Sequence, residues 1–265
     1  MPEFGTWPCD EINYIWRHKN LKSPTDRFTE ELVTPQVEEY IQKEFTKMQS
    51  SLNVDNLVEK TCANSLKIPF INKIFPECKF IFIHRNGYDV ASSAKKRWTA
   101  KLEMKYIWKK VKFVPLSDLP YYGWRYFINR IGKIKSKEKR LSFWGPIYPN
   151  MFKDLENKSL IEVCALQWES CVTNTIMDLK GIDSERIYTI DYETFVSSPQ
   201  EETEKLLGFL TTEVTDDNIS RITKNVSSRS VNNYKKSLSD EEIKLIRPII
   251  DRVSNKLKLL TQNEQ

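Results

Sequence analysis

The chain has 265 residues, of which 40% are hydrophobic and 12% aromatic, values typical of a globular protein with a buried core. Its mean hydropathy is -0.53, and no apolar run approaches the roughly 20 residues of a membrane-spanning helix, so we expect no membrane span. The first residues have neither a basic start nor an apolar segment, so the sequence predicts no secretory signal and a cytoplasmic protein.

Charge and cysteine content exclude some kinds of site. The five cysteines are scattered and form no CxxC pair, and there are only two histidines, so we expect neither a disulfide framework nor a metal site. The net charge of +5 is mild, but basic residues gather in two runs, which usually form solvated faces and could also suit an anionic ligand. These runs are Lys95, Lys96, Arg97, Lys101, Lys105, Lys109, Lys110 and Lys112, and then Arg130, Lys133, Lys135, Lys137, Lys139 and Arg140.

The first half of the chain predicts helices before any clear strand. Residues 1–20 show little regularity beyond a short amphipathic turn or helix at Asp10–Arg17. Pro35–Met48 predicts a helix, since proline occupies the first position and apolar residues recur at helical spacing. Another helix should end near Phe75.

A strand, a turn and a helix then follow within a short stretch. Lys79–His84 is an apolar run typical of a buried parallel strand, and Asn86-Gly87 supplies a turn. We expect Asp89 to cap the helix that follows, with Ser93 one turn into it. The guanidinium of Arg85, the hydroxyl of Ser93 and the amides of a helix start could together hold a phosphate. Asn-Gly also favours a hairpin, although the residues after it are helix formers without alternation.

Residues 113–157 interrupt the alternation of strands and helices. They contain several prolines and aromatic residues, for example in Tyr121–Trp124 and Trp144–Pro149. Such an insert could form the acceptor pocket or its lid, because functional loops commonly project from rigid scaffolds. A small helical subdomain packed on its own aromatic residues explains the pattern equally well.

The remaining elements complete an α/β pattern. The sequence predicts helices at Leu160–Leu179, at Pro199–Leu210 and from Ser239 to about Leu259, with a second apolar strand at Arg186–Ile190. Strands alternating with long helices predict a single α/β domain over residues 1–265, with a parallel sheet flanked by helices. Ligands of such sheets bind beyond the carboxyl ends of the strands, where Arg85 and Tyr192 lie.

Several segments together resemble a known family. They are EKT at 59–61, IPFINKIFPECKFIFIHRNGYDVASS at 68–93, IYTIDYETFVSSP at 187–199 and SVNNYKKSLSDEE at 230–242. Over roughly Leu57–Leu260 the chain resembles sulfotransferases that use 3′-phosphoadenosine 5′-phosphosulfate (PAPS). The resemblance implies a P-loop-like three-layer fold and transfer of a sulfuryl group to a hydroxyl or amine.

The resemblance also implies roles for individual residues. In that family an arginine and a serine at the spacing of Arg85 and Ser93 hold the 3′-phosphate of the donor. The tyrosine at the position of Tyr192 lies at the adenine. The segment that corresponds to Ser228–Lys236, called the closing segment below, supplies further donors to the 3′-phosphate side. The matching positions there are Arg229, Asn232 and Lys235. No metal ion is implied.

Catalytic groups are matched less completely. Lys60 falls where many members carry a lysine near the sulfuryl end of the donor. Cys62 stands where many soluble members have a basic histidine, so that base is missing. Glu59 and Glu11 remain as candidates, and Glu11 is preferred because it lies close to the expected start of the first helix.

The largest departure from the family concerns the loop that binds the 5′-phosphosulfate. Members carry the pattern Pro-Lys/Arg-Ser-Gly-Thr-Thr after their first strand, and its amides cradle the anion. Here Pro2–Trp7 is at best a remnant of it. We therefore expect an N-terminally truncated fold, which binds adenosine 3′,5′-bisphosphate weakly and transfers sulfate poorly.

Three functions remain open from the sequence. The first is a PAPS-dependent sulfotransferase that acts on a small-molecule or carbohydrate acceptor. The second is a non-catalytic protein that binds the nucleotide, and the third is a polyanion-binding module without specificity for a nucleic acid sequence. A P-loop kinase is disfavoured, since the pattern GxxxxGK[S/T] is absent.

Overall fold

A computed structural model describes residues 4–9, 11–100, 110–135, 140–210 and 215–263. The chain divides into two compact units. Unit 1 comprises Met1–Pro76 and Lys96–Met151, and unit 2 comprises Glu77–Lys95 and Phe152–Gln265. Each unit has a core and a parallel pair of strands of its own.

Unit 1 contains a short strand pair that the sequence did not predict. Strand β1 (Phe4–Thr6) pairs in parallel with β2 (Asn56–Val58), with Gly5 opposite Leu57. A Cβ atom on Gly5 would lie 3.0 Å from side-chain atoms of Leu52 and Val54, so close packing accounts for the glycine. Phe4–Thr6, part of the stretch that the sequence analysis compared with the phosphosulfate loop, therefore forms a strand.

The helices of unit 1 follow the predicted order. They are α1 (Asn13–Trp16), α2 (Pro35–Leu52), α3 (Ile68–Ile74) and α6 (Leu119–Lys135), with 3₁₀ turns at Glu30–Leu32, Cys62–Leu66 and Leu116–Asp118. Helix α2 begins at Pro35, and Thr34 Oγ1 accepts a hydrogen bond from the N–H of Val37 at 3.3 Å. The predicted helix is therefore confirmed, together with its proline start.

Aromatic rings form much of the core of unit 1. Phe45 of α2 lies with its ring centroid 5.1 Å from Trp7, 5.1 Å from Trp16 and 4.8 Å from Phe75. Each such ring removes a large apolar area from water, and tilted ring pairs add about 0.5–1.5 kcal/mol beyond that burial. These contacts hold the segment between β1 and α2 against the end of α3.

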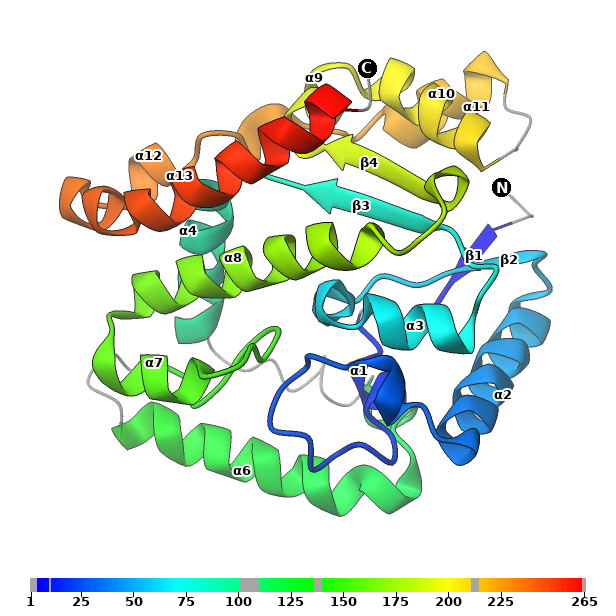
Figure 1. The fold of residues 1–265 in the computed structure, drawn as a ribbon, viewed down its shortest axis with the longest axis horizontal. Coiled ribbons are helices and arrows are strands. Elements are labelled where there is room, and N and C mark those ends of the chain that lie inside the picture. Colours follow the sequence, from blue (N-terminus) through cyan, green and yellow to red (C-terminus); the bar gives the residue numbers. More distant parts are fainter. Residues whose placement is uncertain (1–3, 10, 101–109, 136–139, 211–214, 264–265) are drawn as a thin grey trace. The chain divides into compact units, whose positions relative to one another are not determined.

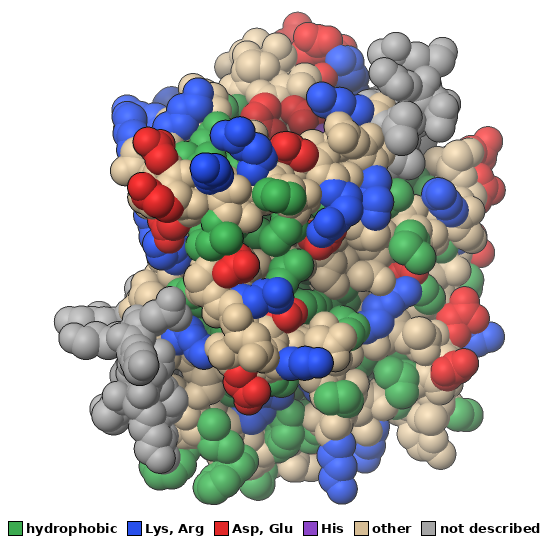
Figure 2. Space-filling view, turned by 60° about the vertical axis from the view of Figure 1, so that its left-hand side comes forward, with side chains coloured by type: hydrophobic (Ala, Val, Ile, Leu, Met, Phe, Trp, Pro, Cys, Tyr) green, Lys and Arg blue, Asp and Glu red, His purple; other side chains and the backbone are tan. Residues whose placement is uncertain are grey.

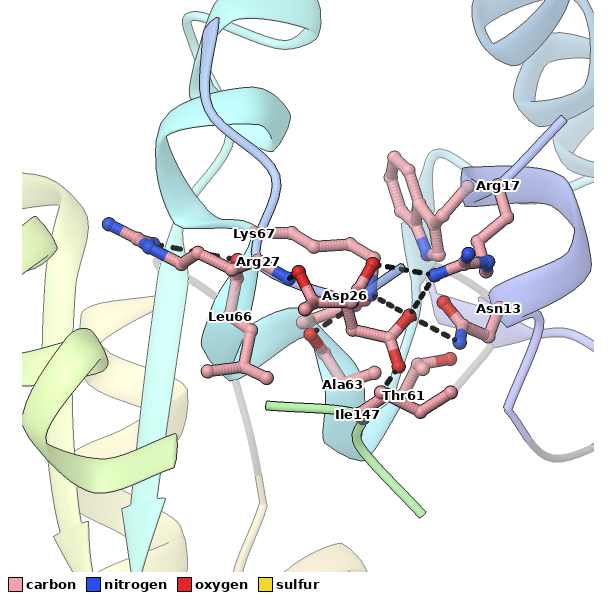
Figure 3. A network of polar contacts seen from close by, with 12 residues as sticks. Asn13, Arg17, Asp26, Arg27, Thr61, Ala63, Leu66, Lys67 and Ile147 are labelled. Atoms are coloured by element: carbon pink, nitrogen blue, oxygen red, sulfur yellow. Dashed lines mark hydrogen bonds and ion pairs between the residues drawn. The ribbon is translucent and has the colours of Figure 1, made fainter. Parts of the chain in front are cut away.

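A buried ion cluster joins three segments of unit 1 that are far apart in sequence (Figure 3). Asp26 is 1% exposed, and its Oδ1 lies 3.0 Å from Nη1 of Arg17 and 3.2 Å from Nζ of Lys67. The Oδ2 atom accepts a hydrogen bond from the N–H of Ile147 at 2.8 Å, and Asn13 donates to Oδ1 at 3.0 Å. The carboxylate thus holds the 140–150 segment to the N-terminal part of the chain.

Unit 2 is built on the two strands that the sequence predicted. Strands β3 (Phe80–His84) and β4 (Ile187–Asp191) run side by side in parallel, with His84 opposite Asp191 (Figure 1). Its helices are α4 (Gly87–Thr99, which continues into unit 1), α7 (Met151–Asn157), α8 (Leu160–Leu179), α9 (Tyr192–Ser197), α10 (Pro199–Phe209), α11 (Asp216–Thr223), α12 (Tyr234–Ser237) and α13 (Asp240–Asn263), with a 3₁₀ turn at Ser228–Ser230. The predicted helices at 160–179, 199–210 and 239–259 are confirmed.

Gly87 lies at the point where α4 meets α8 and α13. A Cβ atom on it would lie 2.6 Å from the ring of Trp168 and 2.7 Å from Cδ1 of Ile250. It was predicted to belong to a turn, but it is the first residue of α4, and it permits a close approach between helices. Asn86 directly precedes α4, and its Oδ1 accepts a hydrogen bond from the N–H of Tyr88 in the first turn of the helix at 2.9 Å.

Substitution of Gly87 with alanine is expected to destabilise unit 2 by about 1–3 kcal/mol, because the added methyl group would overpack a rigid contact. Urea unfolding followed by circular dichroism measures the loss. Gly123 is a matched control, since it also lies in a helix and nothing lies within 4 Å of a Cβ atom placed on it. Gly123→Ala should leave stability unchanged or raise it slightly. Equal stability of Gly87→Ala and the wild type would contradict the role given to Gly87.

The observed fold is helix-rich and contains two small parallel sheets, so parallel strands flanked by helices are confirmed. Within the insert at 113–157, the described residues include helices α6 and α7. No helix within the described ranges is long and apolar enough to cross a membrane. In the same ranges, no cluster of His, Cys, Asp and Glu side chains could hold a metal ion.

Candidate nucleotide site and buried carboxylate

Two predicted site residues meet at neighbouring strand ends in unit 2. His84 and Asp191 are partners in the last register position of β3 and β4, so Arg85 and Tyr192 follow the two strands side by side. The guanidinium carbon of Arg85 lies 4.6 Å from the centroid of the Tyr192 ring. This cation–π contact orients a charged fork at the carboxyl edge of the sheet, where parallel sheets bind ligands.

Ser230 connects both residues to the closing segment of the chain. The Nη2 atom of Arg85 donates a hydrogen bond to the carbonyl oxygen of Ser230 at 2.5 Å, and the Tyr192 hydroxyl lies 2.7 Å from Ser230 Oγ. The buried Nε of Arg85 has no hydrogen-bond partner among the residues that the structure describes. An anion could satisfy this donor, which is evidence that the site fits a phosphate group.

Asp89 fixes the backbone of the closing segment. Its side chain is 2% exposed and accepts hydrogen bonds from the N–H groups of Asn232 at 2.7 Å and Tyr234 at 2.8 Å. Asn232 has φ of 57°, a left-handed conformation that asparagine tolerates better than most residues. The prediction that Asp89 caps α4 is wrong, because the helix already begins at Gly87 and the carboxylate is directed to another segment.

Ser93 is exposed on the surface of α4. It follows Asp89 by four residues, so the two share one face of the helix. The neighbouring Ser92 is 3% exposed, and its hydroxyl lies 2.7 Å from that of Ser237. The structure thus leaves the hydroxyl of Ser93 accessible and uses Ser92 to hold α4 to the closing segment.

The other three predicted residues of the closing segment contribute differently. Asn232 takes part through its backbone N–H, as described above. Arg229 and Lys235 are exposed, and no hydrogen bond or ion pair of their side chains is seen within the described part of the chain. Both side chains are therefore open to solvent.

Unit 1 holds the other candidate residues, among which Glu59 is the most constrained. Its carboxylate accepts hydrogen bonds from Trp16 Nε1 at 3.3 Å, from Thr61 Oγ1 at 2.5 Å and from Asn64 Nδ2. Burial raises the pKa of Glu59 above its usual range, and these donors, together with the charge on Lys67, offset the rise only in part. Lys60, the next residue, is exposed.

The raised pKa of Glu59 can be measured directly. In a chain labelled with ¹³C at glutamate side chains, one carboxyl resonance should titrate at a higher pH than that of a solvent-exposed glutamate, because burial raises the pKa of Glu59. The resonance should be absent from the spectrum of Glu59→Gln and unchanged in that of Glu162→Gln, a substitution in the capping box of α8. A Glu59 signal that titrates at or below the ordinary value would contradict the burial argument.

Glu11, which the sequence analysis preferred as the base, has fewer side-chain contacts than Glu59 among the described residues. It is half-buried with φ of 58°, and its carbonyl oxygen accepts a hydrogen bond from Lys110 Nζ at 3.2 Å. No hydrogen bond or ion pair of its carboxylate is seen among the described residues. Cys62, at the position where the resemblance implies a histidine, is exposed.

The sequence prediction gave no role to Ser230 or Glu193, and it misjudged Asp89. Glu193 Oε1 accepts a hydrogen bond from the N–H of Asn86 at 3.2 Å, so it supports the turn between β3 and α4. Two features of the sequence could have pointed to these residues. Glu193 directly follows Tyr192, and Ser230 lies in the segment that was predicted to contact the 3′-phosphate. Long-range bonds of this kind are invisible to periodicity, because their partners are more than 100 residues apart.

Comparisons with known proteins give consistent results. A family model described as "Sulfotransferase family" matches residues 11–126. Sulfotransferase STF9 from Mycobacterium avium aligns with a TM-score of 0.52 and 14% identity over 89% of this chain and 51% of that protein. The sulfotransferase domain from the curacin biosynthetic pathway aligns with a TM-score of 0.51 and 14% identity over 97% of this chain and 89% of that domain.

These matches differ in what they establish. The two structures show a likeness of fold, and the chain spans about half the length of STF9. A search of curated proteins found no match. The family match, which covers parts of both units, and the shared fold confirm the resemblance to sulfotransferases that the sequence predicted.

Proposed function

We propose that this sulfotransferase-like chain transfers a sulfuryl group from PAPS to a hydroxyl or amine of a small-molecule or carbohydrate acceptor. The observation that carries the proposal is the meeting of Arg85, Tyr192 and Ser230 at the carboxyl ends of β3 and β4. An arginine with a buried unsatisfied N–H, next to an aromatic ring, suits a nucleotide that carries a phosphate.

The proposed donor contacts lie in unit 2. Arg85 binds the 3′-phosphate, with the exposed hydroxyl of Ser93 as a second donor. The ring of Tyr192 lies at the adenine, and Asn232 keeps the closing segment in place through Asp89. Arg229 and Lys235 add positive charge, which raises the local concentration of an anionic ligand.

The proposed chemistry requires a base and a cation. The acceptor oxygen or nitrogen attacks the sulfur atom, its bond to the bridging phosphate oxygen breaks, and the bisphosphate leaves with the electron pair. Lys60 stabilises negative charge on the transferred group or the leaving phosphate. A carboxylate removes the proton of the acceptor, and we propose Glu59 over Glu11, because its position is fixed by three donors and its pKa is raised by burial.

We further propose that residues 1–265 alone bind the donor weakly and transfer slowly. The proposal rests on the sequence, in which the pattern Pro-Lys/Arg-Ser-Gly-Thr-Thr that the resemblance implies for binding the 5′-phosphosulfate does not occur. The proposed site then depends mainly on the 3′-phosphate and the adenine. The acceptor side is assigned to residues 113–157 as part of the same proposal.

Calorimetric titration tests the donor half of the proposal. Adenosine 3′,5′-bisphosphate should bind at least about tenfold more tightly than adenosine 5′-monophosphate, because only the former carries the phosphate that Arg85 holds. Equal affinities would refute the assignment of a 3′-phosphate site. A sulfate-transfer assay with labelled PAPS and a panel of alcohols, phenols and sugars then separates an enzyme from a protein that only binds the nucleotide.

A further inference from the structure

Helix α6 exposes three large apolar side chains on one face. Trp124, Phe127 and Ile128 are 62%, 54% and 39% exposed, and their spacing of three and four residues places them next to one another along the helix. The rings of Trp124 and Phe127 lie 6.1 Å apart. We call these three residues the outer face of α6. Figure 2 shows exposed hydrophobic side chains on the lower part of that view, with Lys, Arg, Asp and Glu side chains nearby.

The opposite side of α6 is held firmly in unit 1. Asn129 exchanges two hydrogen bonds of 3.0 Å with the backbone of Phe143, and the guanidinium of Arg125 lies 4.0 Å from the centroid of the Phe143 ring. Just before the helix, Asp118 Oδ2 lies 2.8 Å from Nδ1 of the buried His18. These contacts fix which side of α6 is presented to solvent, so the exposure of the outer face is a consequence of the fold.

The charge of α6 indicates what covers this face. The helix carries Arg125, Arg130, Lys133 and Lys135 and contains no acidic residue. A helix that combines an exposed apolar face with an excess of basic over acidic residues is typical of segments that lie in the plane of a membrane interface. The aromatic rings enter the boundary between headgroups and acyl chains, and the cations are attracted by anionic lipids.

We propose that the outer face of α6 binds the surface of a lipid bilayer that contains anionic headgroups. A second copy of the chain is a poorer partner, because a symmetric contact would bring the same cations of both copies together. Association with a bilayer in this way needs no membrane-spanning helix. The proposal does not rest on the nucleotide site, but α6 lies within residues 113–157, which the proposed function assigns to the acceptor side. Vesicle binding measured without donor or acceptor therefore tests it separately from sulfate transfer.

Sedimentation of the full chain with vesicles tests the proposal. The chain should sediment with vesicles of phosphatidylcholine and phosphatidylserine in equal amounts, less with phosphatidylcholine alone, and less as the salt concentration rises. Trp124→Ala/Phe127→Ala should bind the anionic vesicles at least about tenfold more weakly, since two rings no longer leave water. Both residues are exposed, so the variant should unfold at the same urea concentration as the wild type.

A matched control comes from exposed apolar residues elsewhere on the chain. Met177 of α8 and Leu245 of α13 are 60% and 46% exposed, and Met177→Ala/Leu245→Ala should bind vesicles like the wild type. The proposal is overturned if the wild type stays in the supernatant, or if both double variants bind equally. It is also overturned if the wild type is a dimer without lipid and Trp124→Ala/Phe127→Ala is a monomer, because the outer face would then be a contact between copies.

Discussion

Replacing Asp26 with asparagine is expected to lower the free energy of unfolding by about 3–5 kcal/mol, because the buried charges of Arg17 and Lys67 would lose the carboxylate that forms an ion pair with both. Lys67 has no exposed area, and the side chain of Arg17 is 4% exposed, so neither charge can turn to solvent without disrupting the fold. An asparagine could still accept one hydrogen bond, but it carries no charge. Chemical unfolding monitored by circular dichroism measures the loss.

A surface pair provides the control for Asp26→Asn. Arg252 forms hydrogen bonds of 2.6 and 3.0 Å with the carboxylate of Glu169, and its side chain is 53% exposed. Exposed pairs contribute about 0–1 kcal/mol, so Glu169→Gln should have little effect. If Asp26→Asn were as mild as Glu169→Gln, the ion cluster would not stabilise unit 1 as argued.

The same cluster predicts how stability depends on pH. Burial by itself would raise the pKa of Asp26, but the charges of Lys67 and Arg17 outweigh it and hold the pKa well below its usual value of 3.8. A carboxyl group whose pKa is lower in the folded state stabilises the fold at pH values above its pKa in the unfolded state. This stabilisation is lost as the pH falls towards its pKa in the folded state. The wild type should therefore lose stability below about pH 4, and the Asp26→Asn variant should lose less over the same range.

The long helices and the central strands could be predicted because their patterns are local. Helix α8 covers the predicted residues without change, since Ser159 and Glu162 form a capping box and apolar residues recur over five turns. Strands β3 and β4 were recognisable as apolar runs between polar turns. The position of Arg85 and Tyr192 at strand ends followed from that alternation.

Other features depend on partners that no local pattern reveals. Strands β1 and β2 have three residues each, too few to show a period of two. Asp26 lies in a polar stretch typical of a surface loop, and its partners Lys67 and Ile147 are 41 and 121 residues away. Asp89 looked like a helix cap for the same reason, because its true partners are 143 and 145 residues further along.

The second large effect is expected at the proposed nucleotide site. Arg85→Ala should weaken binding of adenosine 3′,5′-bisphosphate by roughly ten- to a hundredfold, since hydrogen bonds to charged groups contribute about 1.5–3 kcal/mol. Binding of adenosine 5′-monophosphate should change much less, because it lacks the 3′-phosphate. Arg85→Lys should recover only part of the affinity, since an ammonium group cannot reproduce the planar fork. Isothermal titration calorimetry compares Arg85→Ala and Arg85→Lys with the wild type for each of the two nucleotides.

Arg85 also donates a hydrogen bond to the carbonyl oxygen of Ser230. Arg85→Ala could therefore weaken nucleotide binding indirectly, by displacing the closing segment, and this effect must be separated from the loss of the phosphate contact. Tyr192→Phe removes the other bond to Ser230, between the hydroxyl groups 2.7 Å apart, and keeps the charge of Arg85 and the aromatic ring. If Arg85 acts directly on the 3′-phosphate, Tyr192→Phe should retain most of the preference for the bisphosphate. If both variants lost that preference equally, Arg85 would act by positioning the closing segment. Arg252→Ala, which removes an exposed arginine of unit 2, should leave both affinities unchanged.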